Sequence, residues 1–187
     1  MTKAAVLLAD GFEEIEAITI VDVLRRGGVG VDMLATNGRD EVTGDHGIVV
    51  RADARLGTTD PYDAIILPGG HPGAVALRDN DAVIAALQEM DAAGGLVAAM
   101  CAAPIALGRA GVLAGRTYTC YPGYEDQIDN GEFAEDVVVV DGRLVTSRGP
   151  GTALAFAYAL LDALGKDAAT LRQRMLYTLV AGGSAPE

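Results

Sequence analysis

Short apolar runs alternate with segments of helical periodicity along most of this chain, and this alternation constrains the fold more than any other feature. Four of the runs predict buried strands, at residues 4–8, 30–35, 64–67 and 96–100. Strands that are apolar on both sides need cover on both faces, as in a parallel sheet between two layers of helices. We therefore predict an α/β fold with a mostly parallel sheet, as a single domain over residues 1–187.

The segments between and after these strands complete the predicted layout. Residues 137–146 predict a hairpin around Asp141-Gly142, because Asp-Gly is a strong signal for a tight turn between strands. Residues 43–50 predict an antiparallel excursion, since glycine and aspartate interrupt the run with turn chemistry. The other expected elements are helices at 12–24, 81–92, 104–109, 153–164 and 167–180, and a strand at 117–120.

Charge and composition exclude several classes of function. The chain has 14 basic and 26 acidic residues, a net charge of −12, which repels nucleic acid and anionic lipid. No apolar run reaches the ~18 residues of a membrane helix, and the first residues lack the basic start and cleavage site of a secretory signal. The two cysteines, Cys101 and Cys120, fit a reducing compartment. We expect a cytoplasmic protein that binds neither nucleic acid nor membrane.

Cys101 follows an apolar strand directly and precedes a helix opened by Pro104. This is the strand–turn–helix context of a nucleophile elbow, with cysteine in the place of serine. A helix N-terminus lowers the pKa of a thiol and favours the reactive thiolate, so we expect a nucleophile here. The alternative is a buried structural cysteine. Cys120 has no such context, and we expect it to pack inside a strand.

Three glutamates near the start of the first helix have different explanations. Asp10 and Glu13 have the spacing of a capping box, and Glu14 also suits the positive end of a helix. Glu16 lies beyond that start on a helix that is apolar nearly all round, so we expect partial burial and a raised pKa. A protonated Glu16 can hydrogen-bond a thiolate or act as a general acid and base, whereas the alternative is a solvated surface glutamate.

Glycines after the third strand could supply a site for a negatively charged oxygen. Gly69 and Gly70 expose backbone N–H groups, which together with the N–H of Ala102 could form an oxyanion hole beside the cysteine. Gly-Gly alone is more often a simple turn. His46 and His71 fall in predicted loops and are expected to be solvated. No spacing matches a zinc site or a phosphate-binding loop, so no metal or cofactor is expected.

Four segments taken together resemble the ThiJ/PfpI family, and within it the DJ-one-like branch, which includes a parkinsonism-associated protein. They are residues 11–17 (GFEEIEA), 67–70 (LPGG), 98–104 (AAMCAAP) and 146–152 (TSRGPGT), which occur in order and at matching spacing. The resemblance covers essentially the whole chain. It implies a flavodoxin-like sandwich of the class I glutamine amidotransferase type, and a homodimer.

The resemblance also implies roles for individual residues. It places the family's reactive cysteine at Cys101, its partner glutamate at Glu16, and its backbone oxyanion donors at Gly70 and Ala102. Members are described as glyoxalases that convert methylglyoxal to lactate without a cofactor. Others are described as protein deglycases, stress chaperones or peroxide sensors.

The chain departs from the family pattern at three positions. Ala102 replaces the histidine that follows the nucleophile in the protease-like branch, which argues against peptidase activity. Tyr121 replaces a histidine of the parkinsonism-associated branch, and a tyrosine donates hydrogen bonds but is a poor base near pH 7. We expect Tyr121 to line the pocket as a donor or packing face. His46 stands where that branch has an arginine facing the pocket, and could take over part of its cationic role.

Two functional hypotheses follow. The first is a cofactor-independent enzyme for small reactive carbonyls such as methylglyoxal or glyoxal, in which Cys101 attacks, Gly70 and Ala102 hold the oxyanion, and Glu16 moves a proton. The second is a non-catalytic stress protein whose cysteine oxidises to a sulfinate. Tyr121 favours the second slightly. A third reading, an inert domain, requires all four segments to match by coincidence.

Overall fold

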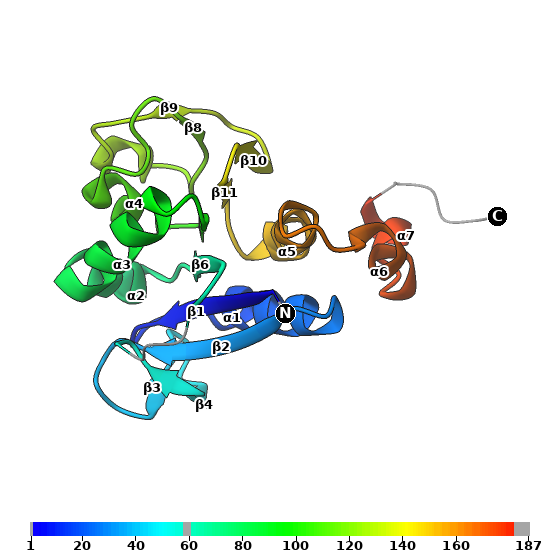
Figure 1. Cartoon of the computed structure of the whole chain (residues 1–187), viewed down its shortest axis with the longest axis horizontal. Coiled ribbons are helices and arrows are strands. Elements are labelled where there is room, and N and C mark those ends of the chain that lie inside the picture. Colours follow the sequence, from blue (N-terminus) through cyan, green and yellow to red (C-terminus); the bar gives the residue numbers. More distant parts are fainter. Residues whose placement is uncertain (1, 58–60, 182–187) are drawn as a thin grey trace.

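A seven-stranded sheet runs through the centre of the molecule in residues 2–57 and 61–181, which the computed structural model describes (Figure 1). Residues 1, 58–60 and 182–187 of the predicted domain lie outside this description. Neighbouring strands are parallel except at one edge, where β10 pairs antiparallel with β11. The order across the sheet is β10 (Val138–Asp141), β11 (Leu144–Ser147), β7 (Leu96–Met100), β6 (Ala64–Leu67), β1 (Lys3–Leu8), β2 (Gly30–Ala35) and β5 (Ala54–Arg55).

Helices cover both faces of this sheet, which confirms the predicted α/β architecture. On one face α1 (Glu14–Arg26) packs against α5 (Ala153–Ala163), and on the other α2 (His71–Arg78), α3 (Asp81–Ala92) and α4 (Pro104–Ala110) pack together (Figure 1). β6 and β7 are buried along their whole length, as strands covered on both sides must be. Two short helices follow α5: α6 (Ala168–Arg174) and α7 (Tyr177–Ala181).

Smaller elements lie outside the central sheet. The predicted excursion at 43–50 is confirmed as the antiparallel pair β3 (Glu41–Thr43) and β4 (Val49–Arg51). The predicted hairpin is β10 and β11, with Gly142 at φ 60° in the turn. The predicted strand at 117–120 is reduced to β8 (Thr117–Tyr118), which pairs with β9 (Glu132–Phe133). Single 3₁₀ turns occur at Glu125–Gln127 and Pro150–Thr152.

Helix boundaries differ from the prediction at two places. The first helix begins at Glu14 instead of residue 12, and its N-cap is Glu13, whose Oε1 accepts from the Ile15 N–H at 3.3 Å. Asp10 is not the cap, because its Oδ1 accepts from the Thr43 N–H at 3.0 Å. The predicted helix at 167–180 is two helices, since Leu176 has a φ of 59° that an α-helix cannot contain.

One helix, α2, was not predicted at all. Pro68-Gly69-Gly70 and the following Pro72 and Gly73 have turn chemistry, so no helix was expected there. In the structure the chain enters α2 directly after Gly70, whose φ is 98°. A Cβ there would lie 2.3 Å from the carbonyl oxygen of Gly11, so this close approach needs glycine. Proline in a first helical turn was the available signal.

The sheet topology locates one end of the molecule as the place for a site. The chain winds from β1 to β2 on one side and returns through β6 to β7 on the other, so strand order reverses beside β1. Ligands bind beyond the carboxyl ends of strands at such a switch point.

Among the described residues, none of the helices combines the length and apolar character needed to cross a membrane.

Candidate functional site

Cys101 is the first residue after β7, at the turn into α4, as predicted. Its φ of 60° is unusual for a side-chain-bearing residue and costs energy that the surroundings must supply. Two hydrogen bonds hold it: its N–H donates to Ser147 at 3.0 Å, and its carbonyl accepts from the Tyr121 N–H at 2.8 Å. The backbone therefore fixes the thiol at the carboxyl edge of the sheet.

Gly69 lets Glu16 and Cys101 come together. A Cβ on Gly69 would lie 2.5 Å from the cysteine Cβ, 3.0 Å from its Sγ and 2.8 Å from Oε2 of Glu16. The Gly69 N–H donates to this Oε2 at 2.7 Å. The Gly69 N–H was predicted to donate to an oxyanion, but in the structure it donates to the Glu16 carboxyl instead.

Glu16 is completely buried, on the first turn of α1. Its Oε1 has no hydrogen-bond partner within the described residues. Burial raises its pKa to about 7, and the charge of Glu13 acts in the same direction, while the Gly69 N–H and the Cys101 thiol partly oppose the rise. This confirms the predicted raised pKa. The surface alternative is wrong for this glutamate.

The thiol of Cys101 does not have the lowered pKa that its position before a helix predicted. Burial raises it to about 12, with the Glu16 carboxylate adding to the rise, and the N–H groups of Gly70 and Ala102 only partly lowering it. Because the two acids act on each other, they form one coupled pair. Above about pH 7 this pair holds a single proton, which either the carboxyl or the thiol can carry.

A small open pocket of about 230 Å³ lies over the thiol. Gly70 and Ala102 belong to its lining together with Cys101, so both predicted oxyanion donors lie where they were expected. Tyr121 also lines it, as predicted, with nearly half of its surface exposed. The remaining lining residues are Glu13, Asp45, His71, Tyr124 and Pro150.

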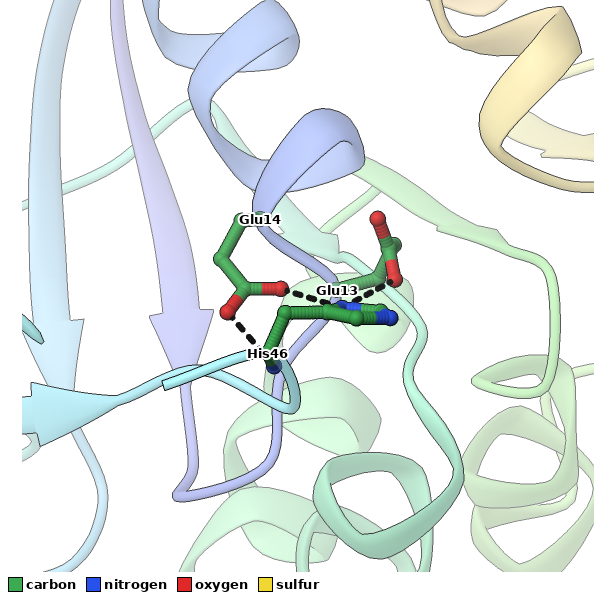
Figure 2. Close-up of side chains that lie close together, drawn as sticks. All are labelled: Glu13, Glu14 and His46. Atoms are coloured by element: carbon green, nitrogen blue, oxygen red, sulfur yellow. Dashed lines mark hydrogen bonds and ion pairs between the residues drawn. The ribbon is translucent and has the colours of Figure 1, made fainter. Parts of the chain in front are cut away.

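His46 does not line this pocket. Figure 2 shows it against Glu13 and Glu14, with Nδ1 2.9 Å from Oε2 of Glu14 and 3.5 Å from Oε2 of Glu13. The hydrogen bond with Glu14 raises the pKa of the imidazole. The imidazole thus faces the first turn of α1, so the structure does not place His46 in the pocket where a cationic role was predicted for it.

The same three side chains are close enough to share a metal ion, since their ligand atoms all lie within 4.8 Å of one another. Their polar atoms already have partners, however. Oε1 of Glu14 accepts from the backbone N–H groups of His46 at 2.7 Å and Ile48 at 3.3 Å, and Glu13 caps the helix. We interpret the group as an ion pair that anchors the loop between β3 and β4 to α1.

Sequence reasoning did not place five of the lining residues in the pocket, and two of these five, His71 and Tyr124, contact each other. His71, expected in a solvated loop, is the first residue of α2, and its Nδ1 lies 2.5 Å from the hydroxyl of Tyr124. Tyr124 was not considered, because it lies in an irregular segment after Pro122. The only signal for either was nearness in sequence to Gly70 and Tyr121.

Cys120 is buried as expected, but it follows β8 instead of lying inside a strand. Its Sγ is 3.8 Å from Oε2 of Glu125. Burial and the charge of Glu125 raise its pKa to about 12. This thiol is outside the lining of the pocket that contains Cys101.

Comparison with known proteins supports the resemblance seen in the sequence. The profile of the DJ-1/PfpI family matches residues 2–163. Protein dj-1beta of Drosophila melanogaster is 40% identical over 173 residues, 89% of this chain and 92% of that protein. Deglycase TK1284 of Thermococcus kodakarensis is 37% identical over 158 residues, 82% of this chain and 94% of that protein.

The fold is shared with solved structures as well. The structure described as oxidized DJ-1 of Toxoplasma gondii has a TM-score of 0.90 and 36% identity, covering 94% of this chain and 98% of that one. With such neighbours, the predicted flavodoxin-like sandwich is confirmed.

Removal of the Glu16 charge should change how stability depends on pH. The carboxyl binds its proton more tightly in the folded chain than in the unfolded one, so its contribution to stability is lost as pH rises from about 4.5 through about 7. The shift corresponds to about 3 kcal/mol. Urea unfolding should give the free energies of unfolding of both proteins at pH 5 and pH 8. The value for Glu16→Gln, relative to that of the wild type, should be higher at pH 8 than at pH 5 by up to this amount. An equal difference at both values would contradict the buried, proton-binding carboxyl.

Proposed function

Because the chain belongs to the DJ-1/PfpI family, we propose that it is a cofactor-independent enzyme acting on small reactive carbonyls such as methylglyoxal or glyoxal. The observation that carries the proposal is the coupled pair of Glu16 and Cys101 beneath an open pocket, where the backbone N–H groups of Gly70 and Ala102 face the sulfur. A relative named as a deglycase supports the same class of substrate. The pocket's small volume suits a substrate of a few heavy atoms.

The reaction begins from the form of the pair in which Glu16 carries the proton and Cys101 is a thiolate. The sulfur attacks the aldehyde carbon, a C–S bond forms, and the carbonyl electrons move to oxygen. The N–H groups of Gly70 and Ala102 hold this oxyanion. Glu16 then gives its proton to the oxygen, which yields a neutral hemithioacetal and a carboxylate.

Glu16 next acts as a base. The carboxylate removes the hydrogen, as a proton, from the carbon bonded to sulfur, giving an enediolate, and returns it to the adjacent carbon while the hydroxyl proton passes to the other oxygen. The hemithioacetal thereby becomes a thioester of a 2-hydroxy acid, without any external oxidant, because one carbon is oxidised as its neighbour is reduced. Water cleaves the thioester, releases lactate from methylglyoxal or glycolate from glyoxal, and regenerates the thiol.

A second function is favoured by a specific comparison. A structural neighbour is described as oxidized, and the unpartnered Oε1 of Glu16 could hydrogen-bond an oxygen added to Cys101. In this reading the protein is a non-catalytic stress sensor or chaperone whose cysteine is oxidised by peroxide through sulfenate to sulfinate. The cysteine is only 9% exposed, so only small oxidants such as peroxide can reach its sulfur.

We also propose a homodimer in the cytoplasm. Four large apolar side chains are exposed around the N-terminal part of α1 and the segment hydrogen-bonded to Glu14: Ile15, Ile18, Ile48 and Val49. Such a group fits a second copy of the chain, as the family resemblance implies. Both cysteines are free thiols, which suits a reducing compartment.

The enzymatic proposal predicts a graded series of variants. Wild-type protein should convert methylglyoxal to lactate, and Cys101→Ser and Glu16→Gln should each lower turnover at least 100-fold, since both act on the reacting atoms. Tyr121→Phe should lower it only a few-fold, because this side chain orients the substrate. Lactate is measured by a coupled assay. Wild-type turnover no higher than that of Cys101→Ser would refute the proposal.

The sensor proposal predicts selective oxidation. Mass spectrometry after mild peroxide treatment should find sulfinate on Cys101, with Cys120 unmodified as an internal control. Glu16→Gln should reduce the sulfinate fraction several-fold by removing the carboxylic acid that holds the product. Oxidation spread over the methionines with Cys101 intact would count against a sensor.

The dimer proposal predicts that charge on the exposed face of α1 separates the copies. Size-exclusion chromatography with light scattering should give a dimer for the wild type and a monomer for Ile18→Glu. Val140→Glu is the matched control, because this exposed valine lies on the edge strand β10. A monomeric wild type, or an Ile18→Glu variant that stays dimeric, would show that this face is not the interface.

A further inference from the structure

We propose that His71, positioned by Tyr124, is a further catalytic residue that moves the oxygen-bound proton of the substrate. This inference rests on the proposed function, and it assigns a step that the pair of Glu16 and Cys101 leaves uncovered. It starts from the position of an imidazole in the lining of the pocket, directly after the oxyanion donor Gly70.

The proposed reaction moves two protons between neighbouring atoms. One passes from carbon to carbon, and the other must pass from the former aldehyde oxygen to the ketone oxygen. Glu16 is completely buried, has Oε2 engaged by the Gly69 N–H, and is not part of the pocket lining. In the proposed reaction it acts on the carbon bonded to sulfur, from the buried side of the thiol. A second group on the open side is needed for the proton on oxygen.

His71 has the chemistry and the place for this transfer. Imidazole accepts and donates protons near neutral pH without a large energetic cost. Its side chain is exposed at the pocket, whereas Cys101 lies at the buried end. The ring and the Gly70 N–H come from the same turn, so an oxygen held by that N–H lies next to the residue that carries the imidazole.

Tyr124 engages Nδ1 of His71, which leaves Nε2 for a ligand. Its hydroxyl lies 2.5 Å from Nδ1, and its ring packs edge-on against both His71 and Tyr121. The proposed step uses the tautomer in which Nδ1–H donates to the tyrosine oxygen and Nε2 presents its lone pair to a ligand. Nε2 takes the proton from the oxygen on the sulfur-bearing carbon and returns it to the oxygen on the adjacent carbon, so the ring ends unchanged.

The surroundings suit a transient positive charge on this ring. The titratable groups that share the pocket with His71 are Glu13, Asp45, Cys101, Tyr121 and Tyr124. Two of them, Glu13 and Asp45, carry carboxylates, which attract an imidazolium formed on His71 during the transfer. Among the described residues His46 is paired with Glu14 away from this lining, which leaves His71 as the imidazole of the pocket.

The test separates this step from the reactivity of the thiol. In His71→Ala, kcat/KM for methylglyoxal should fall about 100-fold, while the rate of alkylation of Cys101 by iodoacetamide stays within twofold of the wild type. Added imidazole should restore part of the lost turnover in His71→Ala and leave the wild type unchanged. Tyr124→Phe should lower kcat several-fold as a positioning change, and Tyr118→Phe, a buried tyrosine outside the pocket, is its matched control.

Each other outcome overturns the inference. Full activity in His71→Ala would show that the imidazole moves no proton. A parallel loss of turnover and of alkylation, without rescue by imidazole, would show that the residue only maintains the elbow. If the wild type itself forms no lactate, the proposed function fails and this step with it, whereas an active wild type with an active His71→Ala refutes this step alone.

Discussion

Two buried acids, Glu16 and Cys101, share one proton above about pH 7, and both proposed functions of this protein depend on that constraint. Neither Glu16 nor Cys101 can ionise without cost, because both are buried, and each opposes the charge of the other. The parallel sheet makes the arrangement possible by ending β6 and β7 side by side. Gly69 completes it, since any side chain there would separate the carboxyl from the thiol.

This coupling explains how a thiol with a raised pKa can still be a nucleophile. In the proposed reaction, the reactive species is the form with the proton on the carboxyl, whose thiolate is held by backbone N–H groups of Gly70 and Ala102. The same proton is then at hand for the substrate oxygen. A pocket with His71 and Tyr124 on its open side adds donors and acceptors where the buried pair does not reach. The two proposed functions, catalysis and peroxide sensing, both use this pair and differ in which small molecule enters the pocket.

Much of this could be predicted from the sequence, for identifiable reasons. The apolar strands and the Asp141-Gly142 turn are local signals, and they predicted the sheet and its antiparallel edge. Glu16 stood out as a carboxylate among apolar helix neighbours. The direction in which the thiol pKa shifts could not be predicted this way, because the burial and the facing carboxylate come from segments far apart in the chain. His71 was missed for the same reason: its partner Tyr124 lies 53 residues away.

The central claim is tested most directly by the rate at which iodoacetamide alkylates Cys101 across the pH range, in the wild type and in Glu16→Gln. If the pair shares one proton, the wild-type rate rises with a step near pH 7, where the first proton leaves, and then stays level into the alkaline range. The step should disappear in Glu16→Gln and be replaced by a single thiol titration at higher pH. A single wild-type step near the ordinary thiol value of about 8.5, unchanged in Glu16→Gln, would contradict the account.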